Sequence, residues 1–234
     1  MRHETRKPVI LATGFSVFPG APENPTAWAI GELERMRWQP DGAMLVTRVL
    51  PVRYDIWNEM DSLLARERPD AVVAFGLSAK ATGFTLEAVA RNQLGLGRPD
   101  AAGAFAHSER LSEGGAVTYA SSLPLMEIKE ALAKGDLLVA PSDEAGDYVC
   151  NLLFYRLMQH IAEAGSPRIA GFVHVPYLED QLPLLARAGL PTSHLKTLTP
   201  AQLIAGTRAI LGVVAKTIAR AKNRPNQRPV GNLL

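Results

Sequence analysis

The stretch Pro8-Val9-Ile10-Leu11-Ala12-Thr13, PVILAT, is a continuous apolar run that breaks at Gly14. A strand buried on one face alternates apolar and polar residues, whereas a strand buried on both faces is apolar along its length. The run therefore predicts a central strand in a sheet that other elements cover on both sides.

The rest of the chain alternates short strand-like runs with longer helical patterns. Asn24-Pro25 is typical of a helix start, with Asn24 as N-cap and Pro25 at the first helical position. Further strands are predicted at 43–50, 70–75 and 169–175, weaker ones at 86–91 and 116–120, and helices at 54–67, 124–134, 147–164 and 200–222. This alternation favours a three-layer α/β/α sandwich with a largely parallel, twisted central sheet. In such sheets ligands bind at the carboxyl ends of the strands.

The composition is that of an ordinary folded chain, with 234 residues of which 47% are hydrophobic and 21% charged. We expect one domain over residues 1–222 and a disordered basic tail over 223–234. No uninterrupted apolar run approaches the roughly 20 residues of a membrane-spanning helix, and the N-terminus does not resemble a secretory signal. A single cysteine cannot form an internal disulfide, so we expect a cytoplasmic protein.

The charge is unevenly distributed, although the net charge is only +2. From Ala201 to Leu234 there is no acidic residue, while six basic residues occur: Arg208, Lys216, Arg220, Lys222, Arg224 and Arg228. A solvated helix face followed by a tail accounts for this pattern better than a nucleic-acid contact, because no aromatic residues are interleaved. We expect neither nucleic acid nor a membrane as a partner.

The only cysteine, Cys150, lies where a helical pattern begins in the sequence GDYVCNLLFY, residues 146–155. The unpaired amides and the positive end of the dipole at a helix N-terminus favour a thiolate over a thiol. The same amides could hold a developing oxyanion. Cys150 is therefore a candidate nucleophile, and an inert core cysteine is the alternative.

Two further polar residues are candidates for chemistry. His174 ends the predicted buried strand in GFVHVPY, where its imidazole could deprotonate a thiol and protonate a leaving amine. Glu87, in TLEAVARN, could orient that imidazole. A hydrogen-bonded structural histidine and a solvated glutamate remain the alternatives, because a single sequence does not show that these side chains meet.

Several segments together resemble the pyroglutamyl peptidase I (pyrrolidone-carboxylate peptidase) family of cysteine peptidases. They are TGFSVFPGAPENP (13–25), LPVRYD (50–55), RPDAVVAFG (68–76), LEAVARN (86–92), AGDYVCNLLFYRLMQHI (145–161) and GFVHVPYLEDQ (171–181). The resemblance implies that Cys150 is the nucleophile, His174 the base and Glu87 the orienting acid. It implies removal of N-terminal pyroglutamate from peptides through a thioester, without a metal or cofactor, and a homo-oligomer, either dimer or tetramer.

The resemblance also implies a pocket for the pyroglutamyl lactam ring. Its predicted substrate-binding residues are Phe15, Phe18, Asn24, Leu77, Arg98, Tyr148 and Val149. Phe15 and Phe18 could equally be loop anchors on the core, and Asn24 only a helix cap.

The sequence departs from the family pattern at two places beside this pocket. The family's G-Q-A-G-G-R reads GLSAKA at 76–81, so Leu77 replaces a glutamine and Ala81 an arginine, which removes polar groups. A second family arginine aligns with Gly97, one position before Arg98. Two alternatives therefore stay open: a cysteine amidohydrolase for another small cyclic or N-blocked amide, and a non-catalytic homologue.

Overall fold

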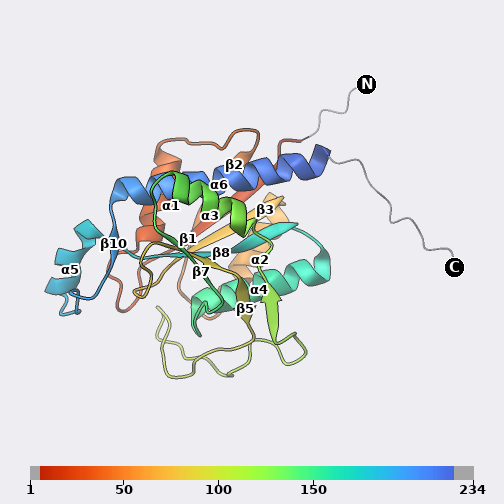
Figure 1. Cartoon of the computed structure of the whole chain (residues 1–234). Helices are drawn as coiled ribbons and strands as arrows, with labels where there is room; N and C mark the ends of the chain where they lie inside the picture. The colour runs from red at the N-terminus through yellow and green to blue at the C-terminus, as the bar shows by residue number, and fades with distance from the viewer. Residues whose placement is uncertain (1–5, 224–234) are drawn as a thin grey trace.

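The computed structural model describes residues 6–223 of the chain (Figure 1). Its strands are β1 Val9–Phe15, β2 Met44–Leu50, β3 Ala71–Leu77, β4 Phe84–Glu87, β5 Val89–Arg91, β6 Thr118–Ala120, β7 Val139–Ser142, β8 Ile169–Val175, β9 Tyr177–Leu178 and β10 Thr197–Leu198. Its helices are α1 Pro25–Arg35, α2 Trp57–Glu67, α3 Leu125–Lys134, α4 Val149–Ala164, the short 3-10 helix η1 Glu179–Gln181, α5 Leu182–Arg187 and α6 Pro200–Asn223.

The central sheet has six strands in the order β2-β1-β3-β8-β4-β7. Strands β2, β1, β3 and β8 are parallel, whereas β4 pairs antiparallel with β8, and β7 then runs parallel to β4. Two small two-stranded pairs, β9 with β10 and β5 with β6, lie outside this sheet. The predicted sandwich with a largely parallel sheet is confirmed.

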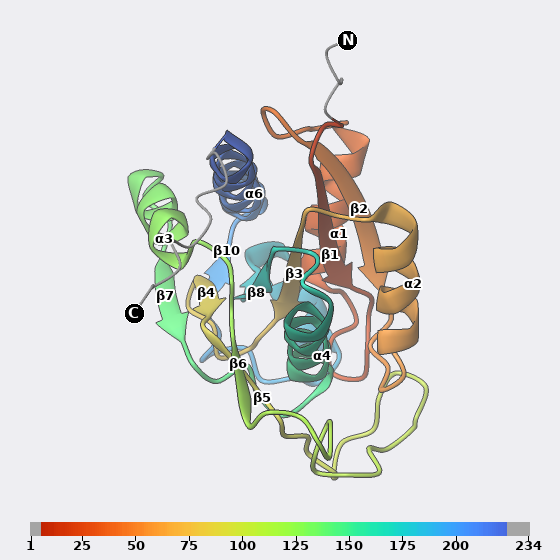
Figure 2. The same ribbon diagram turned by 90° about the vertical axis from the view of Figure 1, so that its right-hand side faces the viewer.

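Helices cover both faces of the sheet (Figures 1 and 2). On one face α1, α3 and α6 contribute the core residues Ile30, Leu33, Ile128, Leu132, Ile210 and Val214. On the other, α2 and α4 contribute Met60, Leu63, Leu153, Phe154 and Leu157. Strand β1, which contains the apolar run at residues 8–13, is buried along its whole length. It contributes side chains to both cores, because successive side chains in a strand point to opposite faces.

The same alternation decides which way the polar residues of the strands point. In β8, Val173 and Val175 pack in the core beneath α6, so that Phe172 and His174 face α4. In β4, Leu86 packs beneath α6, so that Glu87 also faces α4. The helix that carries the only cysteine thus covers the face on which the imidazole and the carboxylate lie.

Several predicted elements differ from the structure in their bounds. The single strand expected at 86–91 is two strands, β4 and β5, and the helices expected from residues 54 and 147 begin at Trp57 and Val149. Strand β7 was not predicted at all. It is an edge strand with Pro141 in it and no buried residue, so it lacks the apolar pattern that marks a strand.

Helix α6 is the one helix of the described residues that is long and apolar enough to span a membrane by length and composition. It contains no uninterrupted apolar run of that length, because polar residues are interspersed along it. Its apolar face packs against the sheet and α3, and the core helix of a soluble protein passes the same test. The predicted basic tail beyond Asn223 lies outside the described residues.

Candidate active site

Cys150 is the second residue of α4, as the sequence pattern predicted within its first turn. The N-cap, Tyr148, has an extended backbone, and its side chain makes no capping hydrogen bond. The first amides of an α-helix have no partner within the helix. Because no side chain caps this helix start, its amides are available to a negatively charged group beside the sulfur.

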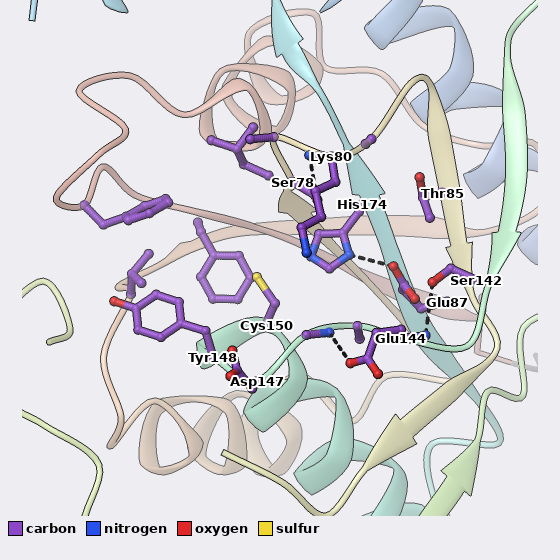
Figure 3. A pocket seen from close by; sticks show the side chains of 18 of the residues that line it. Ser78, Lys80, Thr85, Glu87, Ser142, Glu144, Asp147, Tyr148, Cys150 and His174 are labelled. Atoms are coloured by element: carbon purple, nitrogen blue, oxygen red, sulfur yellow. Dashed lines mark hydrogen bonds and ion pairs between the residues drawn. The ribbon is translucent and has the colours of Figure 1, made fainter. Parts of the chain in front are cut away.

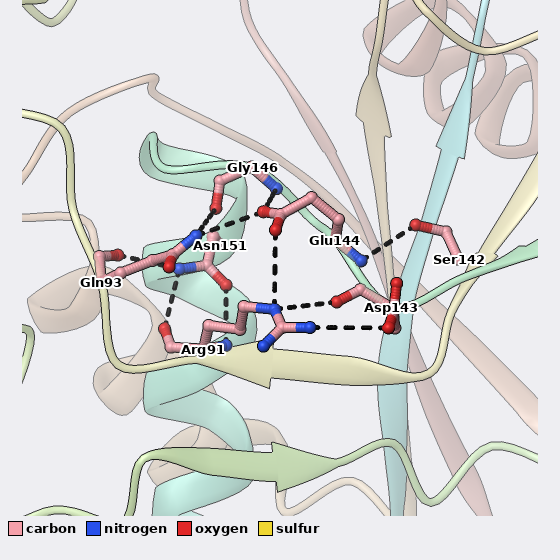
Figure 4. Close-up of polar contacts among 7 residues, drawn as sticks. All are labelled: Arg91, Gln93, Ser142, Asp143, Glu144, Gly146 and Asn151. Atoms are coloured by element: carbon pink, nitrogen blue, oxygen red, sulfur yellow. Dashed lines mark hydrogen bonds and ion pairs between the residues drawn. The ribbon is translucent and has the colours of Figure 1, made fainter.

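The start of α4 is anchored by the residue that follows the cysteine. Asn151 is fully buried, its side-chain oxygen accepts from the Arg91 amide at 3.0 Å, and its side-chain amide donates to the carbonyls of Arg91 and Gln93 at 2.8 and 2.9 Å (Figure 4). These three hydrogen bonds hold α4, the helix that carries Cys150, against β5.

The turn between β7 and α4 is held by a polar network (Figure 4). The Ser142 hydroxyl accepts from the Glu144 amide at 3.1 Å, and the Glu144 carboxylate accepts from the Gly146 amide at 3.2 Å. Arg91 donates to the Asp143 carbonyl at 3.0 Å and forms ion pairs with the carboxylates of Asp143 and Glu144. Gly146 has a φ of 84°, which glycine adopts without strain, so the chain can reverse there into the helix.

His174 and Glu87 meet on the face of the sheet beneath α4. The imidazole Nδ1 lies 2.7 Å from Oε1 of Glu87, and the residues are only 6% and 1% exposed. The antiparallel pairing of β4 with β8 places Glu87 opposite Phe172, diagonally next to His174 on the same face. With Nδ1 donating to the carboxylate, Nε2 is left for other partners.

The environment of His174 favours its charged form. Burial by itself lowers the pKa of His174, but hydrogen bonding and charge attraction from Cys150 and Glu87 outweigh burial and raise this pKa to about 9. The imidazole of His174 therefore favours its protonated form at neutral pH.

A glycine makes room for the sulfur. A Cβ atom on Gly76, in β3, would lie 2.7 Å from two ring carbons of Phe172 and 3.0 Å from Sγ of Cys150. Only a residue without a side chain lets α4 bring its thiol this close to the sheet.

Cys150, His174 and Glu87 line a single cavity of about 650 Å³ (Figure 3). Figure 3 shows Tyr148 on one side of Cys150, and Glu87 and Ser142 on the other. A cavity of this size holds a small ligand and extends beyond the reacting atoms.

The aromatic side of the cavity is built around Arg98. Its guanidinium carbon lies 4.0 Å from the centre of the Tyr148 ring and 5.6 Å from that of Phe18, within the range of cation–π attraction. The loop that presents Arg98 is fixed because Tyr54 donates to the Arg98 carbonyl at 2.7 Å and Tyr148 donates to the Pro99 carbonyl at 2.8 Å. The arginine that stands one position away from the family pattern therefore still reaches the cavity.

Six of the seven predicted substrate-binding residues line this cavity: Phe15, Phe18, Asn24, Leu77, Arg98 and Tyr148. Val149 does not, and its predicted place was wrong: its side chain is fully buried in the apolar core, because helical geometry turns it away from the cavity when Cys150 faces it. Asn24 also caps α1, accepting from the Thr26 amide at 3.1 Å, so the cap is confirmed, while its role in substrate binding stays a prediction.

The loop at 77–81 is more polar than the loss of glutamine and arginine suggested. Ser78 and Lys80 also line the cavity, so a cation stands one position before Ala81. Sequence reasoning also missed Ser142 and Asp147 as lining residues. Ser142 is the last residue of β7, and a polar residue at a strand end is a candidate for such a site. The sequence pattern did not predict β7, so it did not point to Ser142.

Within residues 6–223, no group of three or more His, Cys, Asp or Glu side chains is placed to hold a metal ion. His160, ten residues after the cysteine, packs against Trp57 with ring centres 5.7 Å apart. His3 lies outside the described residues.

A cysteine at a helix start, in one cavity with a buried His–Glu pair, is an arrangement typical of hydrolases that use a cysteine nucleophile. The sequence pattern of the family described as pyroglutamyl peptidase matches residues 8–212, and the chain belongs to this family.

Named relatives and solved structures agree with this assignment. The pyrrolidone-carboxylate peptidase of Thermococcus onnurineus is 36% identical over 74% of this chain and 85% of its own length, and pyrrolidone-carboxylate peptidase 1 of Ralstonia nicotianae is 35% identical over 74% and 80%. A mutant pyrrolidone carboxyl peptidase from Pyrococcus furiosus superposes with a TM-score of 0.82 at 26% identity, covering 89% of this chain and 99% of that one. Pyroglutamyl peptidase I of Bacillus amyloliquefaciens has a TM-score of 0.79 at 26% identity, with 90% and 96% covered.

Proposed function

We propose that this chain is a cysteine peptidase that removes N-terminal pyroglutamate from peptides, with Cys150 as nucleophile, His174 as acid and base, and Glu87 as orienting carboxylate. The observation that carries the proposal is the 2.7 Å contact between His174 and Glu87 in the cavity that Cys150 also lines. Family membership supports the choice of substrate.

In the proposed reaction, the Cys150 thiolate attacks the carbonyl carbon that joins 5-oxoproline to the next residue. The carbonyl electron pair moves to oxygen, and the uncapped amides at the start of α4 stabilise that charge. The carbon–nitrogen bond then breaks while protonated His174 gives its proton to the departing amine. A thioester remains, and neutral His174 takes a proton from a water molecule that hydrolyses it, which restores the thiolate and the imidazolium.

Glu87 supports both halves of this cycle. By accepting from Nδ1 of His174, its carboxylate keeps Nε2 directed at the reacting groups and stabilises the imidazolium. Thiolate and imidazole supply the nucleophile and the protons, so we propose no metal or cofactor.

The aromatic side of the cavity is the proposed site of the lactam ring. A flat, neutral ring suits a wall of Phe15, Phe18 and Tyr148, whereas the charged amino group of an ordinary N-terminus would lose its hydration there. Arg98 and Asn24 provide polar groups on the same wall.

The test is fluorogenic amine release from a pyroglutamyl amide, with a prolyl amide as the control substrate. We expect turnover of the pyroglutamyl amide by the wild-type protein, none by Cys150→Ser, and none of the prolyl amide, which carries a charged nitrogen in place of the lactam. A folded wild-type protein that leaves the pyroglutamyl amide intact would refute the proposal.

We also propose a homo-oligomer, dimer or tetramer, located in the cytoplasm. Family resemblance supports the oligomer, and the lone cysteine supports the reducing compartment. Light scattering coupled to size-exclusion chromatography should give a mass of at least two 25.3 kDa chains, and a monomer mass would contradict the proposal.

A further inference from the structure

One oxygen of the buried carboxylate has no partner. Oε1 of Glu87 contacts His174, but Oε2 is buried, and no hydrogen-bond donor among the described residues reaches it. A buried carboxylate oxygen without a donor is unfavourable, and a carboxylate held at one oxygen only is free to rotate about that contact. The orienting residue of the proposed mechanism therefore needs a second donor.

The sheet places one hydroxyl-bearing residue next to Glu87. Glu87 and Ser142 are partners in the parallel pairing of β4 with β7, and both side chains line the catalytic cavity. Partners in neighbouring strands lie about 5 Å apart and point to the same face. Figure 3 shows the Ser142 side chain next to the Glu87 carboxylate, on the side away from Cys150.

The hydrogen bonds of Ser142 leave its proton available. Its oxygen accepts from the Glu144 amide at 3.1 Å, and its carbonyl accepts from the Ala88 amide at 2.6 Å, so the strand end and the hydroxyl oxygen are both held. Among residues 6–223 the Ser142 hydroxyl donates no hydrogen bond, while Oε2 of Glu87 lacks a donor. The unused donor and the unused acceptor face the same space.

We propose that Ser142 is a positioning residue, whose hydroxyl donates to Oε2 of Glu87 and so holds Oε1 against His174. In the proposed arrangement the hydroxyl reaches Oε2 either directly, after a rotation of one of the two side chains, or through one bridging water. Since Ser142 also begins the turn that leads into α4, it links the orienting carboxylate to the element that carries the nucleophile. This inference rests on the proposed function, in which the imidazolium needs an ionised, fixed Glu87.

Thr85 is the other hydroxyl on this wall, and its position is less suitable. It precedes Glu87 by two residues on the same strand, which separates the two side chains by about 7 Å. Thr85 is opposite His174 in the pairing with β8, and it also lines the cavity. It therefore offers a matched control: Thr85→Val removes a hydroxyl from the same wall without removing the proposed donor.

The experiment compares Ser142→Ala, Ser142→Thr and Thr85→Val with the wild-type protein. The first readout is the pH profile of kcat/KM for a pyroglutamyl amide, and the second is the pH dependence of Cys150 alkylation by iodoacetamide, followed by intact mass. Cys150 is the only cysteine, so the mass change reports this site alone and needs no substrate. Lys80, Arg98, Glu144 and Asp147 are the other charged groups that line the cavity, and all are retained in every variant.

We expect Ser142→Ala to lower kcat by about tenfold, as for the loss of a hydrogen bond to a charged group, with little change in KM. Its pH profile should become narrower. A less firmly held carboxylate stabilises the imidazolium less. The alkylation of Cys150 should therefore begin at a higher pH than in the wild-type protein. On the alkaline side, the decline of kcat/KM should begin at a lower pH. Ser142→Thr, which keeps a hydroxyl, should restore the wild-type profile, and Thr85→Val should keep the wild-type pH limits.

Two results would overturn the proposal. One is a Ser142→Ala protein with unchanged pH limits in both readouts, whatever its rate, because that would be a structural effect alone. The other is an equal narrowing in Thr85→Val. If no variant and no wild-type protein cleaves a pyroglutamyl amide, the proposed function fails, yet the alkylation profiles still decide whether Ser142 acts on the Cys150–His174 pair.

Discussion

A single glycine, Gly76, controls how closely Cys150 approaches the sheet. Gly76→Ala would add a Cβ atom 2.7 Å from Phe172 ring carbons and 3.0 Å from the Cys150 sulfur, closer than ordinary carbon contacts. We expect a loss of about 1–3 kcal/mol in the free energy of unfolding, as for other overpacked cores. We also expect a fall of at least about tenfold in kcat/KM, because a small displacement of a reacting atom is costly.

Urea unfolding and steady-state kinetics on the same protein sample test this prediction. Gly31→Ala is the control, because a Cβ atom on Gly31 meets nothing within 4 Å. Wild-type stability and rate in Gly76→Ala would show that the sheet and α4 are not packed as the structure has them.

The charge of Glu87 helps to raise the pKa of His174, so it should affect the pH range over which the protein is active. Glu87→Gln keeps the shape of the side chain but removes the carboxylate that opposes the effect of burial, so the pKa of His174 should fall below its value of about 9. With a lower pKa, His174 loses its proton at a lower pH, and without that proton it cannot protonate the leaving amine. The alkaline limb of kcat/KM should therefore move to lower pH.

The rate at the optimum should also fall, by on the order of 10³-fold, because a neutral amide no longer holds the imidazole in the correct tautomer. The pH dependence of kcat/KM between about pH 5 and 10, where imidazole and thiol groups titrate, measures both effects. An alkaline limb that stays in place would argue against Glu87 as the partner of His174.

At the scale of elements, α6 contains a matched pair of glycines that test its packing. A Cβ atom on Gly206 would overlap the ring of Phe84 in β4, whereas a Cβ atom on Gly212 meets nothing within 4 Å. Alanine is better than glycine in a helix interior by about 1 kcal/mol. We therefore expect Gly212→Ala to stabilise the protein by up to about that amount.

Gly206→Ala should instead destabilise it by about 1–3 kcal/mol, because the clash with a fully buried ring exceeds the gain in helix propensity. Activity should fall as well, since Phe84 is in the strand that ends at Glu87. Thermal and urea unfolding of the two variants provide the comparison, and stabilisation by both substitutions would contradict the packing of α6 on β4.

The same scale shows why some elements were predictable from sequence and others were not. Strand β1 and helix α1 carry local signals, an apolar run and an Asn-Pro cap, which depend only on neighbouring residues. Strand β7 carries none, because an edge strand with Pro141 is stabilised by its pairing with β4 rather than by its own pattern. Ser142 was missed for this reason.

At the scale of the whole molecule, stability should be concentrated in the middle of the sheet. Strands β1, β3 and β8 lie between neighbouring strands and are buried on both faces, whereas residues 93–117 form an irregular and mostly exposed segment. Amide hydrogens in the central strands should exchange through global unfolding, whereas those in residues 93–117 should exchange through local opening. Peptides from β1, β3 and β8 should exchange at least about a thousandfold more slowly than those from 93–117.

Hydrogen exchange followed by mass spectrometry, at a fixed pH in the absence of denaturant, measures this ratio peptide by peptide. Equal protection in the two regions would mean that the segment at 93–117 unfolds only together with the sheet. Arg98 lies in this segment, so the result also tells whether the aromatic wall of the cavity is fixed before a ligand binds.

The sequence by itself determined the class of fold and the elements on which Cys150, His174 and Glu87 lie, because local periodicity and capping depend on residues near one another in the chain. Only the tertiary structure decided which of these side chains meet. The contact of His174 with Glu87 depends on β4 pairing antiparallel with β8, and the position of Ser142 depends on β7 pairing with β4. Strand order and direction follow from burying the whole sheet between two layers of helices, and no local stretch of sequence contains that information.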